Sequence, residues 1–244
     1  MSSFAQNATA ILVHGAWADG SCWHRVILPL REEGLKITCA PIPLTSLVED
    51  IAALQRVIER TNGPVLLVGH AYGGAVIAGP TDPRVKSLVY VAALAPAEGE
   101  TVADVFYRVN PHPEAPQLAP DKHGLFWMPE GGFAHAVAHR ASPEQTTVLE
   151  AVQRPIAAKC IQEKAPAPAW KSRPSWFLLA EADRMIAPET QRYMAERMGA
   201  KIRRRDVDHS PMYTAPNVVV AVILEAALET LASQPELSGM AHAE

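Results

Sequence analysis

The chain has 244 residues, of which 48% are hydrophobic and 20% charged, as expected for a globular protein with one large α/β domain and a full core. Its formal net charge of −4 argues against a nucleic-acid or anionic-membrane partner, because such partners require a basic surface. Three widely spaced cysteines, Cys22, Cys39 and Cys160, form neither a disulfide framework nor a zinc-site pattern and are typical of a reducing compartment.

The first predicted element is a buried strand at residues 8–13. This apolar run is too short for a signal peptide or a membrane span, and no basic segment precedes it. No later apolar stretch reaches spanning length. We therefore expect a cytoplasmic protein that has no membrane partner.

A His-Gly turn, at His14 and Gly15, follows this strand. The turn is expected to point the backbone N–H of Ala16 toward the space above the sheet, where it can stabilise a developing oxyanion. Trp17 is predicted to contact substrate in the same space. We expect the imidazole of His14 to serve the turn itself rather than the chemistry.

The next strand is predicted at residues 36–41. Ser46 and Glu49 then form a capping box ahead of an apolar stripe at helical spacing, which predicts a helix. Residues 65–69 form a continuous apolar run, which is typical of a strand buried on both faces of a parallel sheet.

Residues 69–74, Gly-His-Ala-Tyr-Gly-Gly, read as a sharp turn from that strand into a helix. The pattern matches the Gly-x-Ser-x-Gly nucleophile elbow, except that Ala71 stands at the serine position. The glycines allow a strained turn in which the side chain of residue 71 projects above the sheet. The backbone N–H of Tyr72, at the helix N-terminus, is the predicted partner of Ala16 in an oxyanion hole.

The regular alternation of strands and helices stops after a strand predicted at residues 87–93. Residues 96–173 are rich in proline, histidine and aromatic residues, which indicates a lid inserted between two strands. Phe106 and Trp127 are predicted to face the substrate, although the aromatic residues of this segment can also form a small core of the lid. Residues 126–133 are predicted to form a hairpin.

The strand predicted at residues 175–180 ends next to two acids, Glu181 and Asp183. An acid at this position can orient an imidazole and stabilise its charged form. Asp183 is preferred because it lies further into the loop, and Glu181 is the alternative. His209 follows a polar strand at residues 201–207, which is predicted to lie near a sheet edge.

Together these elements predict an α/β fold, with a mostly parallel sheet flanked by helices and an inserted lid. Residues 1–95 and 174–233 are assigned to the core, and residues 96–173 to the lid. A helix from residue 188 to about 199 and a closing helix over residues 217–233 complete the core. Residues 234–244 are expected to form a flexible tail.

The candidate residues occur in the chain order nucleophile position, acid, base: Ala71, Asp183, His209. With the segments at residues 13–17 and 69–74, they resemble α/β-hydrolases of the bacterial and plant methylesterase/hydroxynitrile-lyase group. The resemblance covers nearly the whole chain, lid included, and implies the α/β-hydrolase fold. The departure from the group is Ala71.

The resemblance implies a serine nucleophile at position 71, with Asp183 and His209 as its partners. It also implies carboxylic esters as substrates and no metal or cofactor. The main hypothesis is therefore an ester or lactone hydrolase, here an inactivated Ser-to-Ala variant that still binds substrate. The aromatic residues indicate a small, apolar or aromatic substrate. The oligomeric state is left open.

Two alternatives remain. The first is cofactor-free base chemistry by His209 and Asp183, as in lyases or oxygenases of this fold. The related lyases carry Lys after the histidine and Thr at the position of Gly15, whereas this chain has Ser210 and Gly15, which argues against a lyase. The second is a natural non-catalytic pseudo-hydrolase that binds a small ligand.

Overall fold

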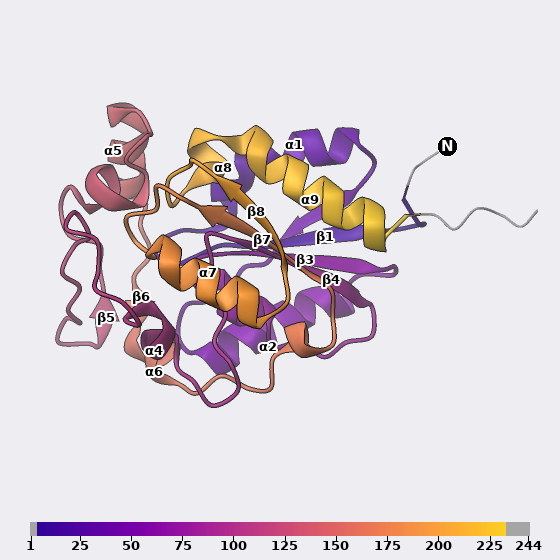
Figure 1. Ribbon diagram of the computed structural model, residues 1–244, viewed down its shortest axis with the longest axis horizontal. Helices are drawn as coiled ribbons and strands as arrows, with labels where there is room; N and C mark the ends of the chain where they lie inside the picture. Colours follow the sequence, from indigo (N-terminus) through magenta and orange to yellow (C-terminus); the bar gives the residue numbers. More distant parts are fainter. Residues whose placement is uncertain (1–3, 233–244) are drawn as a thin grey trace, which may run out of the picture.

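The computed structural model describes residues 4–232 and has a six-stranded sheet at its centre (Figure 1). The strand order is β2-β1-β3-β4-β7-β8, and every adjacent pair is parallel. The strands are β1 (Thr9–Val13), β2 (Lys36–Cys39), β3 (Val65–His70), β4 (Val85–Val91), β7 (Ser175–Ala180) and β8 (Lys201–Arg205). The parallel sheet confirms the predicted α/β class.

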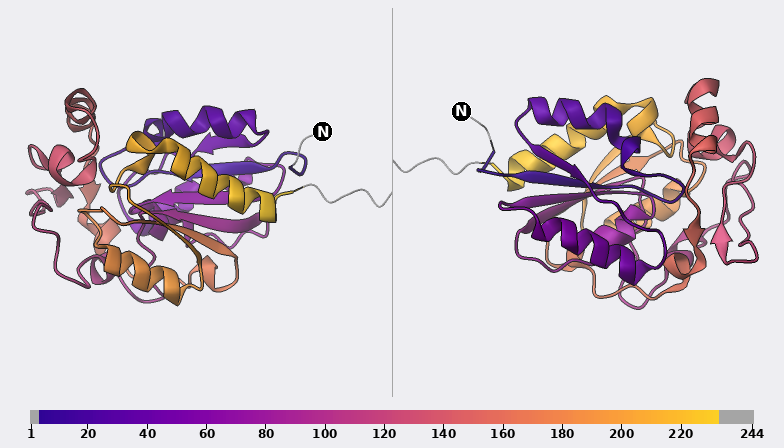
Figure 2. Two further views of the ribbon diagram at one scale, coloured as in Figure 1. Left: turned by 45° about the horizontal axis from the view of Figure 1, so that its top comes forward. Right: turned by 180° about the vertical axis from the view of Figure 1, so that it is seen from behind.

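Helices cover both faces of this sheet, as the two views of Figure 2 show. One layer holds η1 (Gly20–Trp23), α1 (His24–Glu32), α8 (Pro211–Thr214) and α9 (Pro216–Thr230), and the other holds α2 (Leu47–Glu59), α3 (Gly73–Ile77) and α7 (Pro188–Arg197). Side chains alternate along a strand, so Ile11 and Val13 pack toward α2, whereas Leu12 packs toward α9. This arrangement explains the continuous apolar runs of the central strands.

The predicted elements agree with the observed ones to within a few residues. The strand β4 begins at Val85, two residues before the predicted start, and β8 ends at Arg205. The polar strand β8 is an edge strand, as predicted. At the start of α2, Ser46 Oγ accepts a hydrogen bond from the Glu49 N–H at 3.1 Å, which confirms the Ser46 half of the predicted capping box. The Glu49 carboxylate accepts from the Thr45 hydroxyl instead of the Ser46 N–H, so the other half of the box does not form.

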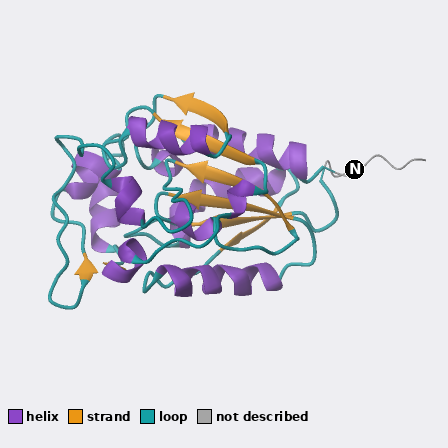
Figure 3. Cartoon of the chain, turned by 60° about the horizontal axis from the view of Figure 1, so that its bottom comes forward, coloured by secondary structure: helices purple, strands orange, loops and turns teal. Residues whose placement is uncertain are grey.

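Over residues 102–162, the segment between β4 and β7 lies at the end of the sheet toward which the strands point, and its last part returns to the start of β7 (Figures 1 and 3). It contains α4 (Val102–Phe106), β5 (Leu125–Phe126), η2 (Phe133–Val137), α5 (Pro143–Ala151), β6 (Ile156–Ala157), α6 (Ala158–Gln162) and η3 (Ala169–Lys171). Its position above the carboxyl ends of parallel strands is where ligands bind in open α/β sheets. The division into core and lid at residues 96–173 stays a prediction.

The hairpin predicted at residues 126–133 is wrong. Phe126 pairs instead with Ile156, in an antiparallel ladder between β5 and β6, and Phe133 begins the short helix η2. The predicted Pro/Gly turn within this segment does form, since Gly131 has φ +74°. The partner strand, however, comes from a segment distant in sequence that local pattern cannot identify. The predicted tail at residues 234–244 lies outside the described residues.

Candidate active site

The turn between β3 and α3 holds Ala71 in the left-handed region, with φ +48°. This conformation is uncommon for a residue with a Cβ, so the surrounding structure must impose it. The backbone does so through three hydrogen bonds: the Ala71 N–H donates to the Val91 carbonyl at 3.3 Å, and the Ala71 carbonyl accepts from Gly74 at 3.0 Å and Leu94 at 2.9 Å. Position 71 therefore has the strained geometry of a nucleophile elbow.

Close backbone approaches around this turn require glycine. A Cβ at Gly73 would lie 2.7 Å from the carbonyl oxygens of Val13 and His14, at the end of β1. A Cβ at Gly15 would lie 2.9 Å from the Ala71 Cβ. The His-Gly turn and the elbow consequently lie against each other, as the sequence predicted.

A buried histidine–carboxylate pair lies beside this turn. The His209 Nδ1 lies 2.8 Å from the Asp183 Oδ2, and both side chains are almost completely buried. Because a carboxylate only accepts, Nδ1 carries the proton, which leaves Nε2 as the basic nitrogen. This is the arrangement in which an acid orients an imidazole and stabilises its charged form.

Backbone and amide donors hold the Asp183 carboxylate in place. Its Oδ1 accepts from the N–H groups of Met185 at 2.7 Å and Ile186 at 2.9 Å, and its Oδ2 accepts from Gln191 Nε2 at 2.8 Å. Gln191, on the inner face of α7, was missed by sequence reasoning, because only the packing of α7 brings it to Asp183. The alternative acid, Glu181, instead pairs with Arg204 at the surface.

A second histidine connects the elbow to the loop that carries His209. His70 Nε2 donates to the carbonyl oxygen of His209 at 2.7 Å, and the two rings lie 4.8 Å apart. Burial holds the pKa of His70 well below its ordinary value, so this ring is neutral. Asp208, the neighbour of His209, accepts from the Arg140 N–H at 3.1 Å and from Thr214 at 2.6 Å.

Two backbone N–H groups next to position 71 donate to no acceptor within residues 4–232. They belong to Ala16 and Tyr72, and both residues line the same cavity as Ala71 and His209. Unpaired N–H groups that face a cavity are suited to a developing negative charge. His14 does not line this cavity: it is buried, its Nδ1 donates to the Gly15 carbonyl at 2.9 Å, and burial lowers its pKa to about 4.

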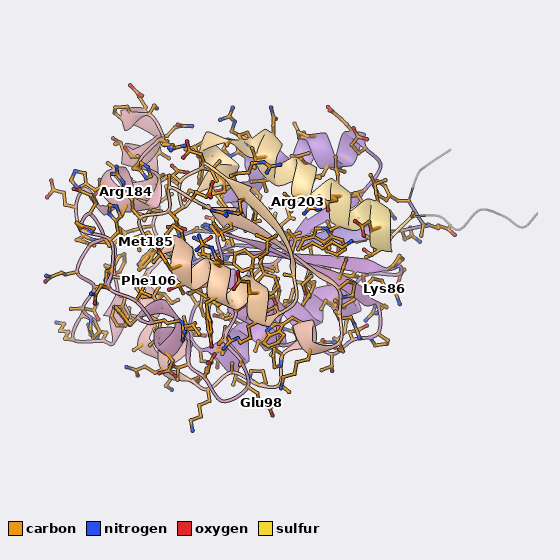
Figure 4. The ribbon with its side chains drawn as sticks, viewed as in Figure 1. Lys86, Glu98, Phe106, Arg184, Met185 and Arg203 are labelled. Carbon is orange, nitrogen blue, oxygen red and sulfur yellow. The ribbon has the colours of Figure 1, made fainter. Side chains whose placement is uncertain are left out.

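The cavity has a volume of about 190 Å³ and lies between the elbow and the inserted segment. Trp17 and Phe106, which are predicted to contact substrate, both line it. Figure 4 shows Phe106, from α4, and Met185, from the loop after β7, at the end of the sheet where the inserted elements lie. Apolar side chains dominate the wall, among them Leu94, Val102, Leu118, Val137, Ile156, Ile161 and Ile186.

The substrate contact predicted for Trp127 does not match the structure. Its side chain is 46% exposed, its Nε1 donates to Asp121 at 3.2 Å, and it does not line the cavity. Side chains alternate along extended chain, so the inward position belongs to its neighbour Phe126. The carbonyl of Phe126 also accepts from Trp17 Nε1 at 2.9 Å, which joins the two walls of the cavity.

Charged side chains of Lys, Arg, Asp and Glu are absent from the cavity wall among the described residues. The residues with polar side-chain atoms that line it are Trp17, His70, Tyr72, Tyr107, Gln162 and His209. Within residues 4–232, no group of His, Cys, Asp and Glu side chains is arranged to hold a metal ion. The arrangement can therefore accept an uncharged, mainly apolar molecule and present its polar centre to His209.

Comparison with known proteins places the chain in a family. The family model of the Alpha/beta hydrolase family matches residues 10–222, and the chain belongs to this family. Methylesterase 3 of Arabidopsis thaliana is 24% identical over 93% of this chain and 98% of its own length.

A carbendazim hydrolyzing esterase of Nocardioides sp. (strain SG-4G) is 30% identical over 43% of this chain, and the match spans about half (49%) of that protein. The crystal structure of a pyrethroid hydrolase from Sphingobium faniae JZ-2 superimposes with a TM-score of 0.76 at 19% identity, covering 91% of this chain and 98% of that one. No helix among the described residues is long and apolar enough to span a membrane.

Proposed function

We propose that the protein with serine at position 71 is a carboxylic ester or lactone hydrolase that acts through a Ser-His-Asp triad. With Ala71, the chain binds substrate without turning it over. The observation that carries the proposal is the buried His209–Asp183 pair at 2.8 Å, which shares a cavity with a position 71 held at φ +48°. The esterase and hydrolase relatives support the same class of reaction.

In the serine form, the hydroxyl oxygen of residue 71 attacks the ester carbonyl while His209 Nε2 takes its proton. The carbonyl oxygen becomes an oxyanion, which the N–H groups of Ala16 and Tyr72 bind. His209 then returns the proton to the departing alcohol and leaves an acyl-enzyme. A water molecule, deprotonated by His209, attacks the acyl group. As the acid leaves, His209 returns the proton to the hydroxyl oxygen of residue 71.

The cavity supports an uncharged substrate with an apolar or aromatic acyl or alcohol group. An uncompensated carboxylate or ammonium group would lose its hydration there without gaining a charged partner. Aromatic and aliphatic side chains in the wall, such as Trp17 and Ile156, favour a flat or extended apolar group.

The test is Ala71→Ser, assayed first with p-nitrophenyl acetate and then with a panel of esters and lactones. We expect hydrolysis to rise by up to about 10⁶ in kcat over the Ala71 chain, because the base, the acid and the oxyanion donors are in place. In that background, His209→Ala should abolish turnover and Asp183→Asn should strongly reduce it. Glu181→Gln is the matched control, since its carboxylate pairs with Arg204, and it should leave the rate unchanged.

A folded Ala71→Ser protein without turnover on the whole panel would contradict the proposal. A near-full rate in Asp183→Asn would show that another acid orients His209.

The intact His209–Asp183 pair beside a methyl group also supports a second candidate, base chemistry without a nucleophile. In that case the Ala71 chain itself would catalyse proton abstraction from an apolar substrate, as in cyanohydrin cleavage or cofactor-free oxygenation. Turnover of such a substrate by the Ala71 chain, lost in His209→Ala, would favour this candidate. Ligand binding without turnover by either form would favour a pseudo-hydrolase.

A further inference from the structure

A buried carboxylate outside the histidine–acid pair contacts the elbow. Asp50, on α2, is completely buried and makes no ion pair within residues 4–232. Its Oδ1 accepts from the Leu44 N–H at 2.8 Å, and its Oδ2 accepts from the Tyr72 hydroxyl at 2.7 Å and from the Cys160 thiol at 3.6 Å. A carboxylate is costly to bury, so these donors must compensate for the lost hydration.

The three donors come from three separate parts of the chain. Tyr72 directly follows position 71 and supplies one of the two free backbone N–H groups. Cys160 lies on α6, in the inserted segment above the cavity. Leu44 lies in the loop after β2 with φ +63°, and its carbonyl accepts from the N–H of Ala157, on β6 of the same inserted segment, at 3.0 Å. The carboxylate therefore connects the elbow to the inserted segment on two routes.

The protonation states of Tyr72 and Cys160 allow both groups to donate hydrogen bonds to Asp50. Burial raises the pKa of Cys160 to about 12 and also raises the pKa of Tyr72, so both groups keep the protons that they donate. Burial also raises the pKa of Asp50, and the hydrogen bonds from Tyr72, Leu44 and Cys160 oppose that rise. The assembly is thus one acceptor held by donors that do not ionise near neutral pH.

We propose that Asp50 is a positioning residue of the active site. By holding the Tyr72 side chain it aligns the Tyr72 backbone N–H with the oxyanion, and by holding Cys160 it keeps the inserted segment closed over the same group. The alignment of the Tyr72 N–H and the closure of the cavity then depend on the same carboxylate. The catalytic part of this inference rests on the proposed hydrolase function, whereas the anchoring of the inserted segment does not.

The first experiment needs no activity. The Ala71 chain is treated with iodoacetamide, and alkylation is followed separately at each cysteine by mass spectrometry. Asp50→Asn and Tyr72→Phe should raise the alkylation rate of Cys160 by about tenfold, because each removes or weakens a hydrogen bond to a charged group. Cys22, which is buried on the other face of the sheet, reports global unfolding and should stay slow.

Tyr90→Phe is the matched control. The Tyr90 hydroxyl is also buried, but it has no hydrogen-bond partner among the described residues, and Tyr90 does not line the cavity. Its removal should leave the alkylation of Cys160 unchanged. A rise in Cys160 alkylation that is equal in Tyr90→Phe and Tyr72→Phe would overturn the specific role of the Asp50 contacts.

The second experiment uses the serine-restored protein. Tyr72→Phe and Asp50→Asn should each lower kcat by about tenfold and change KM by less than about twofold, since the oxyanion bond forms only in the transition state. Tyr90→Phe should change neither constant. A purely structural role would lower the free energy of unfolding without this separation of kcat from KM.

The outcomes are distinguishable. Unchanged Cys160 alkylation in both Asp50→Asn and Tyr72→Phe would overturn the anchoring role. Raised alkylation with unchanged kcat would overturn the link to the oxyanion. Raised alkylation in a chain whose serine-restored form is inactive on every ester would support the anchoring role while the proposed hydrolase function fails.

Discussion

Three buried histidines surround position 71, and their hydrogen bonds assign them different roles. His14 and His70 each donate to a backbone carbonyl, whereas His209 donates to the carboxylate of Asp183. A neutral carbonyl gives a buried imidazole little help in becoming charged, but a carboxylate stabilises the imidazolium directly. His209 is therefore the one of the three that is equipped to accept a proton during a reaction.

The burial of His14 and His70 without a carboxylate partner predicts how the stability of the fold depends on pH. Burial lowers the pKa of His14 from 6.5 to about 4, so the unfolded chain binds a proton at higher pH than the folded chain does. Stability from this group is complete above about pH 6.5 and is lost as the pH falls toward 4, by at most about 3 kcal/mol. The lowered pKa of His70 acts in the same direction.

Urea unfolding of the Ala71 chain at pH 7 and pH 4.5 should therefore show a lower free energy of unfolding at the acid pH. His14→Gln, which has no proton to bind, should reduce the acid loss by about 2 kcal/mol, although the variant itself is less stable at pH 7. An acid loss of the same size in both proteins would show that His14 does not become protonated on unfolding in this range.

At the scale of elements, the ladder between β5 and β6 decides which aromatic side chain of the inserted segment reaches the cavity. The pairing of Phe126 with Ile156 turns both of these side chains to the cavity wall and leaves Trp127 on the outer side. Local sequence places aromatic residues at both positions. The register of the ladder, which depends on a strand 30 residues away, selects between them.

This selection is testable in the serine-restored protein. Phe126→Ala should raise KM for an aromatic ester by about tenfold, because it removes apolar contact with the bound substrate. Trp127→Ala is the neighbouring control and should change KM by less than about twofold, since its ring lies outside the cavity. A larger effect from Trp127 than from Phe126 would contradict the observed register.

At the scale of the whole molecule, the sheet and the inserted segment enclose an uncharged cavity that does not depend on a hydroxyl at position 71. The N–H groups of Ala16 and Tyr72 come from the backbone, and the apolar walls come from both the core and the inserted segment. Replacing a serine hydroxyl by hydrogen removes little volume. We therefore expect ligand binding to be retained without a hydroxyl at position 71.

The Ala71 chain should accordingly bind the ester that the serine-restored protein cleaves best. Calorimetric titration should give saturable binding with a Kd near the KM of the serine-restored protein, and the ester should be recovered intact. The matched sample is Phe126→Ala in the Ala71 chain. Its Kd should rise by the same factor as the KM that this substitution raises in the protein with serine at position 71. Absence of binding at many times KM would mean that the serine hydroxyl shapes the cavity as well as the chemistry.

Local patterns in the sequence were enough to predict the six strands of the central sheet, the helices α2, α7 and α9, the elbow and the residues that follow the strand ends. Each of these depends on neighbours in the chain: the glycines around Ala71, the cap at Ser46, and Asp183 directly after a strand. Parallel strands bring their carboxyl ends to one edge, so strand-end residues such as His209 could be expected to meet there. The preference for Asp183 over Glu181 as the neighbour of His209 also came from position alone.

Tertiary structure alone decided the partners that come from distant segments. Gln191 supports Asp183, His70 holds the loop of His209, and Asp50 joins the elbow to Cys160, yet no spacing in the sequence relates these residues. Their meeting depends on how α2, α7 and the inserted segment pack against the sheet, and packing is set by the shape of whole surfaces rather than by local periodicity. For the same reason, Phe126 and not Trp127 lies against the cavity.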